Sequence, residues 1–436
     1  MKIKFALASL LVFVLNIAFG QEVLTLEQAI NIALKNNFAI EIVRNQEQIA
    51  TNNNTFGNKG YLPSLDATFG KTENKYSQEL VRADGNVVEG DGLKSDNLSV
   101  GLALNWTIFE GFRMVAVRDR LDRFEASAQL NKIAAVANLT ADVMTSYYAI
   151  VQQEELALVT SESMELSRKR KDVSDARLRI GSGSRLMLLQ SQVDFNADSA
   201  LLIRQEVDLK KAKAAINQLL GRDIRTQFEV INEMEIDNSL SYDELFIQLK
   251  SQNPNLQIAR IDQELSSIDI KEFKSQFYPR ANVFGSFDYS KNNFPAGFSF
   301  TQNSTRDGIS FGFGISWNLF NGTYISPNYQ TAKIELINSE LQIKENESLL
   351  ANQLYQAFMD YEANLRLVAL ESSNLEVARE NVDLAFKQYQ QGVINDIDLR
   401  EIQLKQVQSE TNLLVAQYLA KQSEIALKLI SGSLEI

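Results

Sequence analysis

One strand pattern occurs twice in this chain, as LSVGLALNWTIFEG at 98–111 and as GISFGFGISWNLFNG at 308–322. In both stretches large apolar residues alternate with small or polar ones, and each stretch ends in Trp-x-x-Phe-x-Gly. An alternation with a period of two places the apolar side chains on one face of a β-strand. We therefore expect two strands of about twelve residues, each with one apolar face and one small, polar face.

The same duplication extends to the rest of the sequence. LTLEQAINIAL at 24–34 resembles LSYDELFIQLK at 240–250, and YLP at 61–63 matches FYP at 277–279, both 216 residues apart. From the strand pattern onward the offset is 211 residues, so a five-residue difference falls between Pro63 and Ser99. A length difference of this kind belongs in an exposed loop.

The duplication defines the organisation of the chain. A fixed offset over some 200 residues indicates tandem structural repeats. We predict a first repeat over 21–221, an inter-repeat segment over 222–239 and a second repeat over 240–436.

Two long stretches, 112–180 and 323–391, contain no glycine and favour helix. At about 1.5 Å per residue, each continuous helix would be roughly 100 Å long. The second carries a heptad-like row of apolar residues, as coiled coils do. Gly181 and Gly392 then break the helices. The remaining elements are expected as helices at about 185–220 and 396–431, and as strands at about 62–74, 97–109, 279–291 and 308–320.

Composition excludes several classes of function. The 436 residues include no Cys and no His, which excludes thiol catalysis, His-based triads, and thiolate or imidazole metal sites. No phosphate-binding glycine loop or catalytic constellation is recognisable, so we expect neither an enzyme nor a cofactor or metal. The net charge of −12 without a basic stripe argues against a nucleic-acid partner. Residues 1–20 have the charged start, apolar run and small-residue end of a signal peptide.

The two-faced strands have two interpretations. One is a soluble sheet with one face on a core. The other is a sheet facing lipid, favoured by the strand length, by Trp106 and Trp317 near the strand ends and by a small, polar face suited to a wet lumen. Four strands cannot close a membrane barrel, because the smallest have eight strands. A lipid-facing sheet would therefore be shared between two or three copies.

These motifs, in this order and spacing, resemble the TolC family of outer-membrane efflux and secretion channels. The resemblance implies a mostly α fold with four strands per chain, in a homotrimer with one shared twelve-stranded β-barrel and a long periplasmic α-helical barrel. It also implies partnership with a periplasmic adaptor (membrane fusion) protein, an inner-membrane pump of RND or ABC type, and outer-membrane lipid. The location implied is the outer membrane, with a large periplasmic part. Such a protein is the exit duct of a tripartite efflux or type I secretion system.

The resemblance also assigns roles to residues. Gly181 and Gly392 would form the helix turns at the tip of the tunnel, and Pro63 and Pro279 would mark the passage from helix to strand. The barrel-to-helix transition and the membrane-interface aromatics would comprise Trp106, Phe109, Gly111, Trp317, Phe320 and Gly322.

The expected gate of the tunnel is an acidic constriction at Asp398 and Glu401, six and nine residues after Gly392. Two positions depart from the family pattern: Ile394 stands where a basic residue is expected, and Met187 stands where the first repeat would carry an acid. The alternative is that both acids lie on a solvated helix face.

Two further interpretations remain from the sequence. The basic run at 168–171 is most simply a charged outer helix face, with adaptor contact as a second possibility. The whole chain could instead be a soluble periplasmic or surface coiled-coil scaffold, since long helices fit both functions.

Overall fold

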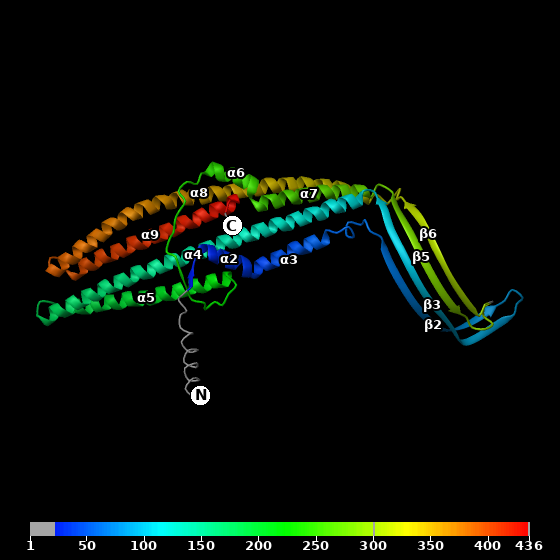
Figure 1. The fold of residues 1–436 in the computed structure, drawn as a ribbon, viewed down its shortest axis with the longest axis horizontal. Helices are drawn as coiled ribbons and strands as arrows, with labels where there is room; N and C mark the ends of the chain where they lie inside the picture. Colours follow the sequence, from blue (N-terminus) through cyan, green and yellow to red (C-terminus); the bar gives the residue numbers. More distant parts are fainter. Residues whose placement is uncertain (1–21, 300, 435–436) are drawn as a thin grey trace, which may run out of the picture. The chain divides into compact units, whose positions relative to one another are not determined.

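The structure is a computed structural model that describes residues 22–299 and 301–434 (Figure 1). The expected signal peptide, 1–20, lies outside these residues. In chain order the elements are β1 (Glu22–Leu24), α2 (Leu26–Asn36), α3 (Phe38–Asn53), β2 (Ser64–Val81), β3 (Val87–Glu110), α4 (Arg113–Arg179), α5 (Arg185–Leu219), β4 (Phe228–Val230), α6 (Tyr242–Gln252), α7 (Pro254–Ser275), β5 (Arg280–Asn293), β6 (Asn303–Ser316), α8 (Ile325–Gln391) and α9 (Asp396–Ser431).

The mostly helical fold class, with four strands in the main sheet, is confirmed. The glycine-free stretches form α4 and α8, each 67 residues long. No helix in the described part of the chain carries an apolar run long enough to cross a bilayer. A short parallel pair, β1 with β4, was not expected from the sequence.

The chain divides into two compact units. Of the described residues, the first unit contains 22–45, 129–258 and 344–434, and the second contains 46–128, 259–299 and 301–343.

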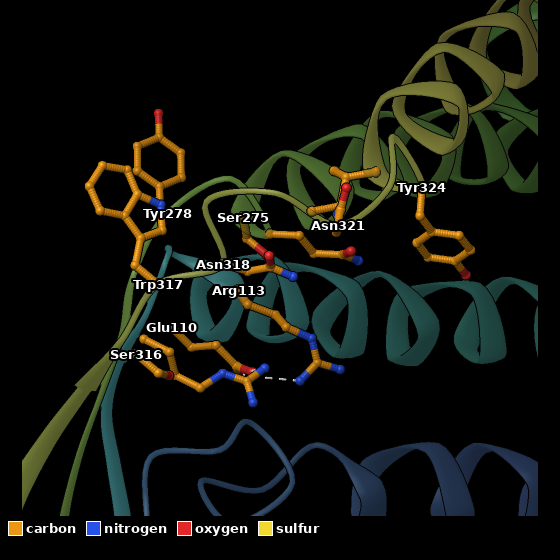
Figure 2. A pocket seen from close by; sticks show the side chains of 12 residues that line it. Glu110, Arg113, Ser275, Tyr278, Ser316, Trp317, Asn318, Asn321 and Tyr324 are labelled. Atoms are coloured by element: carbon orange, nitrogen blue, oxygen red, sulfur yellow. Dashed lines mark hydrogen bonds and ion pairs between the residues drawn. The ribbon is translucent and has the colours of Figure 1, made fainter.

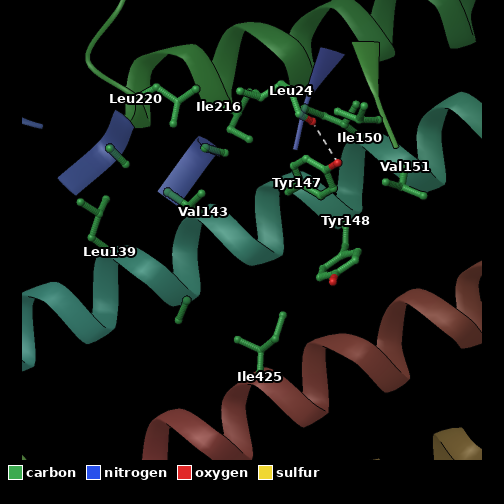
Figure 3. Packing of buried hydrophobic residues seen from close by; sticks show 14 of the residues in the cluster. Leu24, Leu139, Val143, Tyr147, Tyr148, Ile150, Val151, Ile216, Leu220 and Ile425 are labelled. Carbon is green, nitrogen blue, oxygen red and sulfur yellow. Dashed lines mark hydrogen bonds between the residues drawn. The ribbon is translucent and has the colours of Figure 1, made fainter. Parts of the chain in front are cut away.

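The first unit is organised around a buried cluster that includes Leu24, Val143, Tyr147, Ile150 and Ile216 (Figure 3). The Tyr147 hydroxyl donates a hydrogen bond to the carbonyl oxygen of Leu24 at 3.1 Å. It also accepts one from the backbone N–H of Ile231 at 3.0 Å. One side chain on α4 thus holds both the segment that starts the first repeat and the segment that follows β4.

The inter-repeat segment is anchored to α9 by charge. Lys421 and Glu424 are buried, and the ammonium group of Lys421 donates to the carbonyl oxygen of Glu235 at 2.7 Å. Hydrogen bonds from Ser239, together with the nearby ammonium of Lys428, lower the pKa of Asp237 to about 2. Side chains of α9 therefore provide hydrogen-bond and ion-pair partners for polar groups of the inter-repeat segment.

The second unit contains the antiparallel sheet in the order β2-β3-β5-β6 (Figure 1). Its ladders repeat with the offsets seen in the sequence: Ser64 pairs with Asn105 in the first hairpin, and Arg280 pairs with Ser316 in the second. These are equivalent positions under the offsets of 216 and 211 residues. The two hairpins therefore have the same register.

The strand ends differ from the expected ones. The first hairpin continues well beyond 74 and 97 to a tight turn at 82–86, where Gly85 has a φ of 85°. β6 ends at Ser316, so the expected residues 317–320 lie outside the strand. The reason is the register, because β5 begins at Arg280 opposite Ser316 and offers no partner farther along.

Candidate channel surfaces: the two-faced sheet and the helix-turn tip

The sheet has two chemically different faces. Cross-strand partners lie on the same face, so the ladders align Leu65, Leu104 and Phe311 on one side, joined through Gly285. This apolar face is open to the surroundings in the single chain, and Phe311 is 87% exposed. The other face is small and polar, with the hydroxyl groups of Ser286 and Ser310 at 2.8 Å. The alternation predicted from the sequence is therefore continuous across the sheet.

The two tryptophans have equivalent roles in the two hairpins. The indole N–H of Trp106 donates to the carbonyl oxygen of Tyr61 at 3.0 Å, and that of Trp317 donates to the carbonyl oxygen of Phe277 at 3.0 Å. Each acceptor lies two residues before the proline that precedes the incoming strand, Pro63 or Pro279. Each tryptophan thus ties the end of the outgoing strand to the start of the incoming one while its ring stays partly exposed.

The residues after each tryptophan lie at the passage from strand to helix. Gly111 and Gly322 have φ angles of 57° and 66°, and they lie two residues before the start of α4 and three residues before the start of α8. The ring of Phe109 packs edge-on against Phe112 at 5.3 Å, whereas Phe320 is 82% exposed.

A cavity of about 660 Å³ opens beside the second of these corners (Figure 2). The carboxylate of Glu110 pairs with the guanidinium groups of Arg113, at 3.3 Å, and Arg280, and Figure 2 shows Glu110 beside Arg113. Trp317 and Tyr324 line the same cavity. Its wall therefore combines a neutralised charge cluster with exposed aromatic rings.

Gly181 and Gly392 form the turns at the ends of the long helices. Both have a φ of 79°, in the left-handed region that glycine adopts without strain. After each turn a side chain caps the next helix: Ser184 accepts from the N–H of Leu186 at 3.2 Å, and Asn395 accepts from the N–H of Asp398 at 2.9 Å. The sequence thus specifies two matching helix-turn-helix tips.

The predicted acidic residues lie on the exposed side of α9. Asp398 and Glu401 are both exposed. The hydrogen bond and charge of Lys405, whose ammonium is 2.7 Å from the carboxylate, lower the pKa of Glu401. Ile394, at the position expected to be basic, packs against the apolar cluster of Ala385, Tyr389 and Leu399. Both acids are therefore exposed within one chain. Among the described residues, no basic side chain from the other helical turn pairs with either of them.

A buried ion pair that the sequence analysis missed links the two repeats near the tip. Arg170 on α4 is 0% exposed, and its guanidinium group contacts both carboxylate oxygens of Asp396 on α9, at 2.7 and 3.1 Å. The same group lies 3.2 Å from the carboxylate of Asp194 on α5 and 3.4 Å from the amide oxygen of Gln403. One arginine therefore connects α4, α5 and α9.

A second ion pair extends this network. The Arg400 guanidinium holds both oxygens of Asp198 at 2.8 Å, and Ser167 donates to Asp198 at 2.6 Å. Burial disfavours the charged form of Arg400, but the hydrogen bond and charge of Asp198, with Asp194 and Asp396 nearby, outweigh it and raise its pKa. Arg400 therefore stays charged at any physiological pH.

The interpretation of the basic run 168–171 as an outer face is wrong for Arg170. A signal for its burial was present: Ser163, Ser167, Arg170 and Ser174 recur at steps of four, three and four. All four are buried, and the small serines leave room for the guanidinium group. Arg168, by contrast, is exposed and pairs with Glu165 on the same helix.

Residues 29–222 and 245–433 match the family model described as outer membrane efflux protein. The chain belongs to the outer membrane efflux protein family. It is 21% identical over 410 residues to the outer membrane efflux protein BepC of Brucella suis biovar 1 (strain 1330), covering 90% of this chain and 84% of that protein. It is 20% identical over 385 residues to the alkaline protease secretion protein AprF of Pseudomonas aeruginosa, covering 85% and 76%.

The fold is likewise that of solved members of this kind. The outer membrane protein VceC of Vibrio cholerae superposes with a TM-score of 0.75 at 16% identity, covering 93% of this chain and 96% of that chain. The resemblance to the TolC family is therefore confirmed for family and fold. The two segments matched by the family model lie almost entirely within the predicted repeats.

Proposed function

We propose that this protein is a passive exit duct in the outer membrane, serving a tripartite efflux or type I secretion system. The observation that carries the proposal is the open four-stranded sheet, apolar on one face and small and polar on the other, in a chain whose α4 and α8 are 67 residues each. An apolar face of this extent requires lipid or protein to cover it. A polar opposite face suits a water-filled lumen.

The sheet closes only with other copies. Four strands leave β2 and β6 as unpaired edges, which lipid does not tolerate. A homotrimer would supply twelve strands in one barrel, and its helices would form a tunnel in the periplasm. A periplasmic adaptor and an inner-membrane pump of RND or ABC type would then deliver the cargo. The names of the relatives, an efflux protein and a protease secretion protein, support this class of partner.

At the tip of the tunnel we propose two roles for charge. Asp398 and Glu401, exposed within one chain, would form acidic rings around the threefold axis, where like charges repel and attract cations. The Arg170–Asp396 pair would hold the two helical hairpins of each chain together. Transport itself would need no chemistry from the chain.

The test is single-channel conductance of the purified mature protein in planar bilayers, with and without millimolar divalent cation. We expect discrete small steps that the cation blocks, and weaker block in Asp398→Ala/Glu401→Ala. Glu244→Ala, which removes an exposed acid on α6, should be blocked like the native protein.

The possible outcomes test three hypotheses: the channel function, the role of the two acids in its gate, and the scaffold alternative. Equal block in all three proteins would keep the duct and remove the two acids from the gate. A protein that stays soluble without detergent, fractionates with the soluble periplasm and never conducts would instead be a coiled-coil scaffold.

A further inference from the structure

The apolar face of the sheet ends at a row that contains lysines. On β2, β3 and β5, cross-strand pairing makes the last apolar row Phe69, Val100 and Tyr289. The next row on the same face, two residues farther along each strand, is Lys71, Leu98 and Lys291. The border of the apolar face nearer the turn at 82–86 is therefore basic.

The opposite border, at the helix end of the strands, is aromatic. Trp106 pairs with Val283, and Phe109 pairs with Ala281, both on the apolar face. On the described rows of this face between these pairs and Tyr289, no lysine occurs. The two borders of one apolar face thus differ in chemistry: one is aromatic and uncharged, and the other is charged.

A second pair of lysines lies two rows beyond the first. Lys75 on β2 and Lys94 on β3 are direct cross-strand partners, so their side chains leave the sheet on the same face. Like charges directly opposite one another destabilise an antiparallel pair. An anion between the two ammonium groups would remove this repulsion.

The acids between the two lysine rows have partners within the chain. The carboxylate of Glu73 lies 2.6 Å from the ammonium group of Lys71. That of Asp96 accepts a hydrogen bond from the side-chain amide of Asn293 at 2.8 Å. Neither acid forms an ion pair with the outer lysine pair.

Three of the four lysines remain for a ligand outside the chain. Lys75, Lys94 and Lys291 are exposed, and among the described residues none of them forms an ion pair. A hollow of about 410 Å³ is lined by Lys75 and Lys94. Since the only further acid on the described part of these rows is Asp307, opposite Tyr289, four lysines stand against three acids. A net positive charge therefore remains where the apolar face ends.

We infer that the lysine border, defined as Lys71, Lys75, Lys94 and Lys291, binds the phosphate groups of an anionic lipid surface. The inference rests on the lipid-facing sheet of the proposed function and specifies the headgroup chemistry at one of its two borders. Continuity with the apolar face argues for lipid, because the headgroups of a bilayer follow directly on its hydrocarbon core. Two residues of a strand span about 7 Å. A lipid whose chains cover the last apolar row therefore carries its headgroup beside the first lysine row.

Lysine suits such a contact. Its methylene groups lie along apolar surface while its ammonium group reaches the phosphate layer. Each lysine close to an anionic membrane surface strengthens the attraction to it. The aromatic border offers no charge of this kind, so anionic lipid should gather at the lysine border only.

Fluorescence quenching by brominated lipid tests the inference. The variant Trp106→Phe/Trp317→Phe/Leu98→Trp has a single tryptophan, because the native chain has two. Position 98 lies between Lys71 and Lys291 in the first lysine row. This reporter protein is reconstituted in phosphatidylcholine vesicles that contain the same fraction of either brominated phosphatidylcholine or brominated phosphatidylglycerol, with the bromine near the headgroup. The protein with its native tryptophans reports the aromatic border in the same vesicles.

We expect brominated phosphatidylglycerol to quench the reporter about threefold more than brominated phosphatidylcholine, and both lipids to quench the native tryptophans equally. Adding Lys75→Gln/Lys94→Gln/Lys291→Gln to the reporter should bring this ratio close to one. Lys75→Arg/Lys94→Arg/Lys291→Arg, which keeps the charge, should retain the preference.

A matched control removes the same charge elsewhere. Lys35→Gln/Lys210→Gln/Lys344→Gln replaces three exposed lysines of the helices and should leave the ratio unchanged. A preference lost equally in this control would overturn the assignment to the lysine border.

The remaining outcomes separate this inference from the proposed function. A ratio near one in the reporter, or a ratio unchanged by the three glutamines of the lysine border, overturns the inference, while quenching by either lipid shows that the sheet still faces lipid. Loss of the preference in inorganic phosphate, but not in sodium chloride of the same ionic strength, would reveal a soluble phosphate ligand and overturn the assignment to lipid. Reporter and native tryptophans that neither lipid quenches would overturn both the inference and the lipid-facing sheet.

Discussion

Replacing Arg170 by methionine should loosen the tip region, because the change keeps much of the side-chain volume but removes a buried charge. The guanidinium group makes three of its hydrogen bonds to Asp396, through the two carboxylate oxygens and the carbonyl oxygen at 3.3 Å. Asp396 is only 3% exposed, so its carboxylate would lose its partner without gaining water. Breaking a buried pair in this way costs about 3–5 kcal/mol.

Amide hydrogen exchange measures this change where it occurs. The free energy of local opening for residues 163–174 and 396–403 should fall by about 3 kcal/mol or more, which is exchange faster by about a hundredfold. Amides around Tyr147, in the buried cluster of the first unit, should keep their protection. If the Arg170–Asp396 pair helps to hold the tip closed, the same variant should also conduct in larger steps.

Two further variants distinguish the effect of losing the buried ion pair from the effect of losing any positive charge. Arg168→Met removes an exposed arginine from the same basic run and should leave exchange unchanged. Arg170→Met/Asp396→Leu removes both buried partners and should recover most of the lost protection, since paired replacement by apolar groups is often neutral. Equal effects of the Arg168 and Arg170 variants, or a double variant as loose as the single one, would refute the assigned role.

Three other predictions concern stability and placement. Tyr147→Phe removes both hydrogen bonds of a buried hydroxyl and should lower the free energy of unfolding by about 1–3 kcal/mol, measured by denaturant titration. The lowered pKa of Asp237 means that its contribution to stability is complete above its ordinary value of 3.8 and is lost as pH falls toward about 2; Asp237→Asn should flatten acid unfolding in that range. Trp106→Phe and Trp317→Phe each leave a single tryptophan, and in both proteins lipid brominated near the headgroup should quench the remaining fluorescence; emission unaffected by brominated lipid would place the rings away from the interface.

The helical architecture could be predicted well from the sequence, because glycine and proline interrupt helices through their backbone conformations. A stretch of 69 residues without glycine left few alternatives to a long helix, and Gly181 and Gly392 lie in the turns expected of them. The period of two identified the apolar face of the sheet. These signals are local, so one chain is sufficient to specify them.

The errors had two sources: a local turn signal that was overlooked, and features that depend on neighbouring elements. The β2–β3 hairpin was expected to end early, although Asp84-Gly85 is a strong signal for a tight turn between strands. β6 was expected to continue past Ser316, but a strand needs a neighbour to satisfy its backbone groups. Arg170 was assigned to a solvated face because charge runs usually are solvated, and only its burial among serines reveals the network.

The ion pairs between α4 and α7 have a consequence for the order of events in folding. Arg113 and Arg123 on α4 and their partners Glu272 and Glu264 on α7 belong to one polypeptide, so they meet at a high effective concentration set by the connecting chain. The apolar face of the sheet, in contrast, stays open in the single chain, where Phe311 is 87% exposed. The contact between α4 and α7 can therefore form within one molecule, whereas the apolar face is removed from water only when lipid or another protein covers it.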